Sequence, residues 1–236
     1  MILTIQFRED VTEEHEQQCI LKRLPADQEA TFVSIFDETI DFKKPKQLLK
    51  GADKLILGGS AALSMAPGHE HTDYKKVDHI LRTLAPLTRY ILEQDFPTLG
   101  ACFGHQLIAH FAGSVIAYDT EQAESGVGKI SLTPQGEQDP LFKDVSKDFY
   151  AITSHQDSVI GVPKGAALLA RSERCTVHAL RFGNNVYTTQ FHSELDEQEH
   201  AYRVSLFPQY AAHAIQHDES CLLEGAAILQ NFLAMR

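Results

Sequence analysis

The sequence predicts an α/β protein with a mostly parallel central sheet flanked by helices. Three observations support this fold class. Strands and helices alternate with short links in the first part of the chain, which is typical of a parallel sheet covered on both faces. A strand at 96–101 passes through a tight turn into an amphipathic helix. Short strands separated by Gly, Pro and Asn turns then occupy 115–191 and predict an added β-rich layer.

The first elements follow from apolar alternation and from helix start and stop signals. Residues 2–7 alternate as a strand does, and Thr12 is placed to cap a helix that runs to about Leu24, before Pro25. Ligands of parallel sheets bind beyond the carboxyl ends of the strands, so the turns after these strands are candidate site positions. We expect further strands at 30–36 and 54–57, a short helical segment at 48–52, a polar loop at 61–76 and a helix at 77–93.

The second half is predicted to be rich in strands and to end in helices. A hairpin turn at 182–186 delivers the last strand. The expected strands cover 115–118, 126–133, 149–153, 167–172, 176–182 and 186–191, and the expected helices cover 195–206, 210–217 and 221–233.

Composition limits the classes of function. A chain of 236 residues fits one domain with a substantial core, and its net charge of −11 disfavours nucleic acid and anionic membranes as partners. The four cysteines are scattered, without a C-x-x-C pair, which indicates a reducing compartment and argues against disulfides or a zinc knuckle. The start lacks the basic lead of a signal peptide, and no apolar run is long enough to span a membrane, so we expect a cytoplasmic protein.

Cys102 is the candidate nucleophile. It follows a predicted strand and lies between Gly100 and Gly104, where the missing Cβ atoms let neighbouring backbone pass close by. A side chain at such a corner is exposed, and the positive end of the following helix favours a thiolate. The alternative is a buried core thiol, which is common for free cysteine.

The candidate base and its orienting group end a later strand. His192 and Glu194 are two positions apart, so their side chains face the same way in an extended segment. Glu194 can accept the proton of one imidazole nitrogen while the other nitrogen faces a thiol, as a cysteine nucleophile requires. The alternative is a strand-end histidine beside a solvated glutamate.

Together these segments resemble the class I glutamine amidotransferases. The family pattern G-x-C-x-G-x-Q, followed some ninety residues later by a strand ending in H-P-E, matches here over roughly 50–195. Ser193 stands where proline is usual, and the glycine-rich turn reads G-G-S where G-G-P is more usual. The matching residues of the two motifs are Gly100, Cys102, Gly104, Gln106, His192 and Glu194.

Two further segments carry the resemblance. The turn Gly58-Gly59-Ser60 after a strand looks like the family's oxyanion turn, and 153–157 is similar to the S-H-x-D segment of the glutaminase domain of GMP synthetase. By this resemblance the N–H groups of Gly59 and Phe103 form the oxyanion hole. The expected substrate wall consists of Gly58, Gln106, Ser154 and His155, the last also being the rival of His192 as base.

The resemblance implies a flavodoxin-like amidotransferase domain at 1–195, with a helical extension at 196–236 packed on the same domain. The implied reaction releases ammonia from the glutamine side-chain amide through a cysteinyl thioester on Cys102, with His192 as acid and base, and it requires no metal or organic cofactor. The ammonia could pass to a partner synthetase, or the chain could be a free-standing glutaminase. Hydrolysis of γ-glutamyl peptides and a non-catalytic binding role on the same scaffold are the alternatives.

Two groups of histidines remain outside this set. His69, His71 and Asp73 alternate in the polar loop, where a solvated loop, a lid or an acceptor-recognition loop is favoured over a metal site. His213 and His217 are one helical turn apart, and a solvated helix face is favoured there. The sequence therefore predicts no metal ligands.

Overall fold

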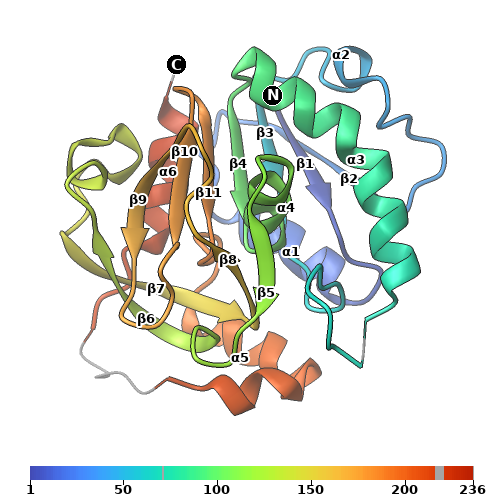
Figure 1. Ribbon diagram of the computed structural model, residues 1–236. Helices are drawn as coiled ribbons and strands as arrows, with labels where there is room; N and C mark the ends of the chain where they lie inside the picture. Colours follow the sequence, from blue (N-terminus) through green and yellow to red (C-terminus); the bar gives the residue numbers. More distant parts are fainter. Residues whose placement is uncertain (71, 216–220, 236) are drawn as a thin grey trace.

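A nine-stranded sheet forms the centre of the molecule (Figure 1). The computed structural model describes residues 1–70, 72–215 and 221–235. The sheet order is β2-β1-β3-β4-β11-β10-β9-β6-β7; neighbours from β2 to β11 run parallel, and neighbours from β11 to β7 run antiparallel. The first half comprises β1 (Ile2–Gln6), α1 (Thr12–Leu21), β2 (Ala30–Ser34), α2 (Pro45–Leu48), β3 (Lys54–Leu57), α3 (Tyr74–Gln94), β4 (Thr98–Ala101) and α4 (Phe103–Phe111).

The predicted α/β class is confirmed, and the β-rich half continues the same sheet edge to edge. Within the described residues, β5 and β8 pair separately, as a two-stranded antiparallel ribbon. The second half comprises β5 (Val115–Tyr118), β6 (Glu124–Leu132), η1 (Gly136–Gln138), η2 (Pro140–Phe142), β7 (Asp148–His155), β8 (Asp157–Ile160), β9 (Ala166–Arg171), β10 (Ala179–Phe182), β11 (Val186–Thr189), α5 (Glu197–Leu206), η3 (Pro208–His213) and α6 (Gly225–Ala234).

Helices cover both faces of the sheet, and each face has its own core. Successive strand residues point to opposite faces, so Leu55 and Leu57 of β3 join the core beneath α3 and α4, whereas Ile56 joins the core beneath α6. The second core contains four residues of α6: Ile228, Leu229, Phe232 and Leu233. The inner parallel strands β1, β4 and β11 are therefore buried on both faces, whereas the edge strand β2 is only half-buried.

Several predicted boundaries are wrong for identifiable reasons. Thr12 is the first residue of α1 and not its cap, because the side chain of Asp10 accepts the Thr12 N–H at 2.8 Å. The helix ends at Leu21, where i→i+3 turn hydrogen bonds replace the helical pattern. Pro45 at the first helical position starts α2 earlier than expected. Asp73 caps α3 by accepting the N–H groups of Lys75 and Lys76, so α3 starts at Tyr74.

The chain beyond β11 also differs from the prediction. The segment expected as a helix at 210–217 is the 3-10 helix η3, which Pro208 begins; residues 216 and 217 lie outside the described part. His213, expected on a solvated face, is buried, and its Nε2 lies 3.1 Å from Gln156 Nε2, which donates to it. None of the described helices combines the length and apolar character needed to cross a membrane.

Candidate active site

Three neighbouring strands end at one place. β3, β4 and β11 lie side by side and parallel, and Thr189 at the end of β11 pairs with Ala101 at the end of β4. The chain that leaves these ends carries Gly59, Cys102 and His192. These three residues meet: a Cβ built on Gly59 would lie 3.0 Å from His192 Cε1 and 3.3 Å from Cys102 Cβ.

Cys102 occupies a strained corner between β4 and α4. Its φ of +50° and ψ of −102° are rare for a residue with a side chain. The two flanking glycines make this corner possible, because a Cβ on Gly104 would lie 2.4 Å from the Leu57 main-chain oxygen and one on Gly100 would lie 2.7 Å from the Gly104 oxygen. The G-x-C-x-G motif is thus a packing requirement of the corner.

The imidazole of His192 is held by a carboxylate. Its Nδ1–H donates to Glu194 Oε1 at 2.7 Å, and its main-chain N–H donates to the Ile152 oxygen at 2.7 Å. Arg203 Nη1 of α5 lies 3.3 Å from the same Glu194 oxygen. Burial raises the pKa of Glu194, but His192 and then Arg203 lower it more, so this carboxyl is a stronger acid than usual.

The thiol and the imidazole shift each other's protonation. Burial disfavours the charged imidazole, but the Glu194 carboxylate and the Cys102 thiol outweigh it and raise the pKa of His192 to about 9. Burial likewise disfavours the thiolate, but a hydrogen bond and charge from His192, with the charges of His155 and Arg8, set the pKa of Cys102 below its usual value. Each group therefore shifts the other toward the thiolate–imidazolium form.

The two expected oxyanion donors are in different states. Phe103 is the first residue of α4, and its N–H has no acceptor within the described part of the chain. The N–H of Gly59 donates to Glu16 Oε1 at 3.3 Å. Glu16 is buried and paired with Arg8, whose Nε lies 3.1 Å from the same oxygen. Gly59 must therefore leave Glu16 before its N–H can face a substrate oxygen.

The residues expected to form the substrate wall lie beside Cys102. The Ser154 main-chain oxygen is 3.7 Å from Cys102 Sγ. Gln106 Nε2 donates to the Asp157 main-chain oxygen at 2.9 Å, which ties α4 to β8. His155 borders the same space, but its Nδ1 faces the Asp157 main chain at 3.1 Å. Both main-chain groups of Gly58 are hydrogen-bonded within the protein: its N–H donates to the Ile5 oxygen, and its oxygen accepts from the Gly104 N–H.

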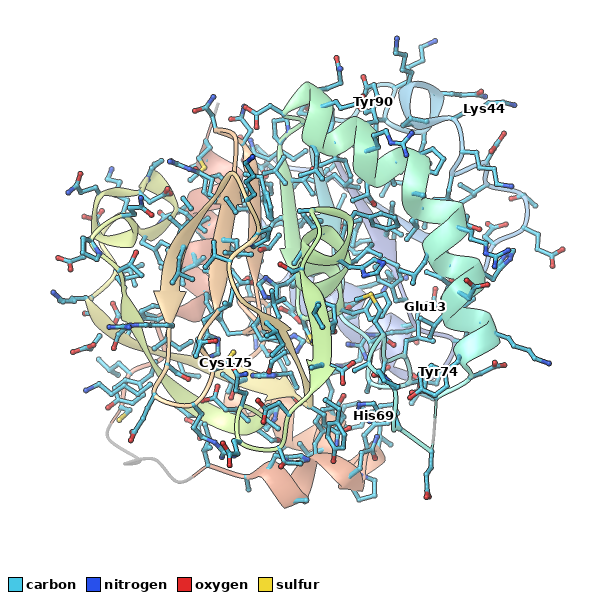
Figure 2. All side chains as sticks on the ribbon, viewed as in Figure 1. Glu13, Lys44, His69, Tyr74, Tyr90 and Cys175 are labelled. Atoms are coloured by element: carbon cyan, nitrogen blue, oxygen red, sulfur yellow. The ribbon has the colours of Figure 1, made fainter. Side chains whose placement is uncertain are left out.

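Asp157 holds much of the 61–76 loop against this wall. His69 Nε2 lies 2.6 Å from Asp157 Oδ1, and the Ser64 hydroxyl donates to Asp157 Oδ2. The His69 N–H donates to the Tyr74 hydroxyl at 2.8 Å, at the start of α3 (Figure 2). His71 lies outside the described residues. The expectation of a solvated loop is wrong for this part, because His69 and Ser64 are buried.

Residues of α5 and of the segment that follows it, between 203 and 210, cover Cys102. Two pockets adjoin its side chain, each of about 20 Å³, which is room for a water molecule and not for an amino acid. Cys102 is only 4% exposed. A larger hollow of about 750 Å³ lies between the 35–43 loop and α3, away from these side chains. One of the small pockets is lined by Arg8, Ser60, Ala61, Ser154 and His192 together with Arg203, Val204, Phe207 and Tyr210.

The sequence reasoning missed five of these residues. Arg8 comes directly after β1, so the rule that ligands bind at strand ends could have found it. Asp157 lies inside the S-H-x-D segment, but the motif alone assigns it no role. Glu16, Arg203 and Tyr210 reach the site only through the packing of α1, α5 and η3, for which the local sequence gives no signal.

The comparisons with known proteins identify the family. The family model described as glutamine amidotransferase class-I matches residues 32–206. The chain belongs to this family. The family assignment supports amidotransferase chemistry and places the corner cysteine and the strand-end histidine within the matched region.

Curated relatives add a more specific likeness. The chain is 31% identical over 158 residues to one subunit of the glutamine-hydrolyzing GMP synthase of Sulfurisphaera tokodaii, covering 66% of this chain and 75% of that protein. It is 38% identical over 109 residues to the corresponding subunit from Methanococcus aeolicus, where the match spans 46% of this chain and 56% of that protein. In the longer glutamine-hydrolyzing GMP synthase of Bacillus velezensis, at 35% identity, 47% of this chain matches 21% of that protein.

Solved structures of other glutamine amidotransferases share the fold. A glutamine amidotransferase from Thermotoga maritima superposes with a TM-score of 0.66 at 17% identity, covering 98% of this chain and 95% of that one. A glutamine amido transferase from Methylobacillus flagellatus gives a TM-score of 0.64 at 16% identity, with coverage of 98% and 93%. At these identities the likeness supports the α/β architecture.

Proposed function

We propose that the protein hydrolyses the side-chain amide of glutamine, with Cys102 as nucleophile, His192 as acid and base, and Glu194 as the group that orients His192. The observation that carries this proposal is the line of contacts from a strained corner thiol through one imidazole to a buried carboxylate. A site that only binds a ligand needs neither a thiol of lowered pKa nor a carboxylate hydrogen-bonded to the neighbouring imidazole.

The first half of the reaction forms a thioester. The Cys102 thiolate attacks the amide carbon, and the carbonyl oxygen becomes negative. The free N–H of Phe103 and the N–H of Gly59, once released from Glu16, can donate to that oxygen, and loss of one such donor typically raises the barrier by about 2.7–4 kcal/mol. The His192 imidazolium gives its proton to the leaving nitrogen, and ammonia departs.

The second half returns the enzyme to its starting state. His192, now neutral, takes a proton from water, and the hydroxide formed attacks the thioester carbon. The carbon–sulfur bond breaks, glutamate leaves, and the thiolate again faces an imidazolium. Glu194 keeps one imidazole tautomer through both steps because it accepts only from Nδ1.

Substrate entry requires a rearrangement at the covered pocket. Glutamine does not fit a space of about 20 Å³, so Phe207 and Tyr210 must move away from Cys102 before catalysis. We propose that residues 1–195 form the catalytic domain and that residues 196–236 are an extension packed on it. The family match runs on to residue 206, so α5 belongs both to the matched family sequence and to the cover over Cys102.

The acceptor of ammonia is proposed to be a partner synthetase. This proposal is supported by the relatives whose names describe one subunit of a glutamine-hydrolyzing GMP synthase. It is also supported by the Bacillus velezensis protein, in which the matching region is a small part of a longer chain. The enzyme is proposed to act in the cytoplasm.

The test is glutamate release by the purified protein from glutamine and from γ-glutamyl peptides. We expect release from glutamine, its loss in Cys102→Ser, and its retention in the matched variant Cys221→Ser, whose cysteine lies outside the site. Release from peptides alone would replace the proposal with a peptidase function. No release from either, with Cys102 inert to a glutamine-like chloroketone, would contradict the catalytic assignment.

A further inference from the structure

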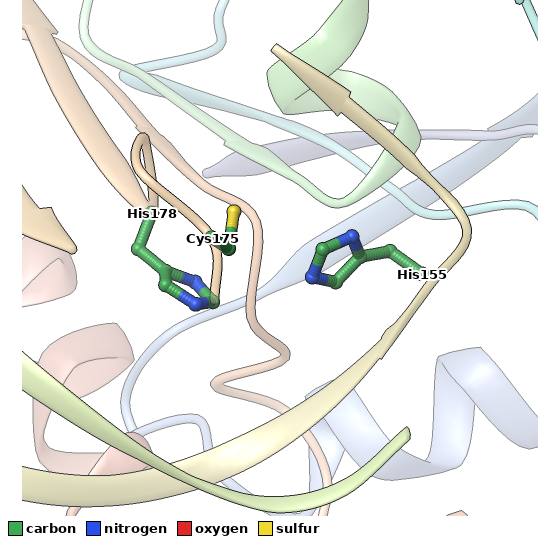
Figure 3. Close-up of side chains that lie close together, drawn as sticks. All are labelled: His155, Cys175 and His178. Carbon is green, nitrogen blue, oxygen red and sulfur yellow. The ribbon is translucent and has the colours of Figure 1, made fainter. Parts of the chain in front are cut away.

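A second group of chemically active side chains lies behind the active-site wall. One ring nitrogen each of His155 and His178 and the sulfur of Cys175 all lie within 4.8 Å of one another (Figure 3). All three side chains are at most 1% exposed. They come from the end of β7 and from the turn between β9 and β10, and the proposed reaction uses neither Cys175 nor His178.

In each histidine, the ring nitrogen that points away from the cluster is hydrogen-bonded to a neighbouring oxygen, and we call it the outer nitrogen. His178 Nε2 lies 2.9 Å from Glu124 Oε2, and His155 Nδ1 lies 3.1 Å from the Asp157 main-chain oxygen. A carboxylate and a carbonyl only accept hydrogen bonds, so these nitrogens carry the protons. When such a ring is neutral, its other nitrogen has a free lone pair that can bind a metal ion.

Those remaining nitrogens have no hydrogen-bond partner in the described part of the protein. His155 Nε2 and His178 Nδ1 are buried and unpaired there, and His155 Nε2 is 3.6 Å from Glu124 Oε2, beyond a hydrogen bond. Buried polar atoms are nearly always paired, so two orphaned nitrogens beside one cysteine sulfur require an explanation. Figure 3 shows the three side chains grouped about a common space.

We propose that His155, Cys175 and His178 bind a zinc ion. Imidazole and thiolate are the ligands zinc prefers, and a histidine whose outer N–H donates to a carboxylate, as His178 does to Glu124, is the usual support for a zinc ligand. The ion's two positive charges balance the Cys175 thiolate and the buried Glu124 carboxylate. A water supplies the fourth ligand.

The turn that carries Cys175 is held beside the Glu124 carboxylate. The Cys175 main-chain N–H donates to the Ser172 hydroxyl at 2.8 Å, and that hydroxyl donates to Glu124 Oε1 at 2.8 Å, which fixes the turn beside the carboxylate. A search for a C-x-x-C motif cannot find this set, because Cys175 and His178 share one turn with only one cysteine, and the third ligand, His155, comes from the end of β7.

The position gives the ion a structural task near the catalytic cysteine. His155 follows Ser154, whose main-chain oxygen contacts Cys102 Sγ. Binding of zinc would join the end of β7 to the 172–178 turn and hold the wall in place.

The experiment measures zinc content in a Cys102→Ser background, which prevents the catalytic thiol from binding metal. After reconstitution with zinc and dialysis, we expect about one zinc per chain. Reconstitution with cobalt should give a thiolate-to-cobalt charge-transfer band, and a chelator should lower the unfolding temperature. Cys175→Ser and His178→Gln should each lose the zinc, the band and the chelator effect.

The matched control is Cys19→Ser, which removes another buried cysteine that lies beside His15 and is not part of the cluster, and it should keep all three properties. Circular dichroism of each variant separates a lost ligand from a lost fold, and His178→Gln is the second variant should Cys175→Ser not fold. No zinc in the background protein, or as much zinc in both ligand variants as in the background protein, would overturn the proposal and leave a buried His155–Glu124 ion pair beside a thiol.

Discussion

Arg8 Nε and Glu16 Oε1 lie 3.1 Å apart beneath the oxyanion turn, and both side chains are almost completely buried. The same carboxylate oxygen accepts the N–H of Gly59, so one ion pair connects α1 to the turn that should receive the substrate oxygen. The Arg8 charge also favours the Cys102 thiolate. The pair therefore acts on stability and on the site together.

Replacing one member of this ion pair should lower the free energy of unfolding more, per substitution, than replacing both members together. Arg8→Met and Glu16→Gln each leave a buried group without its partner, and we expect each to lower the free energy of unfolding by about 3–5 kcal/mol. The double variant should lose clearly less than the sum of the two, with a coupling of about 0.5–3 kcal/mol. Chemical denaturation of the four proteins measures this. The exposed pair Arg82–Asp78 is the control and should show almost no coupling; additive losses at Arg8 and Glu16 would contradict the prediction.

Glu194→Gln should shift the pH dependence of Cys102 alkylation upward. In the wild type, Glu194 is the largest cause that raises the pKa of His192, to about 9, and the charged imidazole lowers the pKa of Cys102. Without that carboxylate His192 loses its proton at lower pH, and the thiol then ionises only at higher pH. The rate of alkylation by iodoacetamide, followed from acidic to alkaline pH, should therefore rise at a higher midpoint. An unchanged midpoint would show that Glu194 does not control the thiol.

The residues of the reacting group could be predicted because their signals are local. Cys102 is marked by the two glycines that its corner requires, and His192 and Glu194 are marked by their i, i+2 spacing just after β11. The strands that lead to them, β4 and β11, end side by side in the parallel part of the sheet. These local signals were therefore enough to predict that the three residues lie together.

The surroundings could not be predicted, because they depend on packing between distant segments. Glu16 reaches Gly59 only through the docking of α1, and Tyr210 reaches Cys102 only through the path of the chain after α5. The cluster of His155, Cys175 and His178 joins the end of β7 to the turn between β9 and β10, which only the antiparallel half of the sheet brings together. No spacing rule detects such contacts, and the same limit explains why the sequence places His213 in solvent.

Removing the cover over Cys102 should make it more reactive. Tyr210 is 8% exposed and borders both small pockets at Cys102, so Tyr210→Ala should enlarge the opening. We expect alkylation by a glutamine-like chloroketone to become several times faster. Leu206→Ala is the matched control, because Leu206 is 41% exposed at the end of α5 and lines neither pocket. Equal rates in the two variants would show that η3 does not limit access.

Alanine at two glycines of the site should separate activity from stability. A Cβ on Gly59 would meet His192 Cε1 at 3.0 Å and Cys102 Cβ at 3.3 Å, so Gly59→Ala should displace the reacting groups while the fold survives. Small misplacements of this kind can cost about 10²-fold in rate, and we expect a loss of that order in glutamate release. A Cβ on Gly104 would lie 2.4 Å from the Leu57 main-chain oxygen, which has no room to move inside the sheet. Gly104→Ala should therefore lower the unfolding temperature or prevent folding. Full activity in Gly59→Ala would mean that this turn does not face the substrate oxygen, because any group near that oxygen would also meet the added methyl.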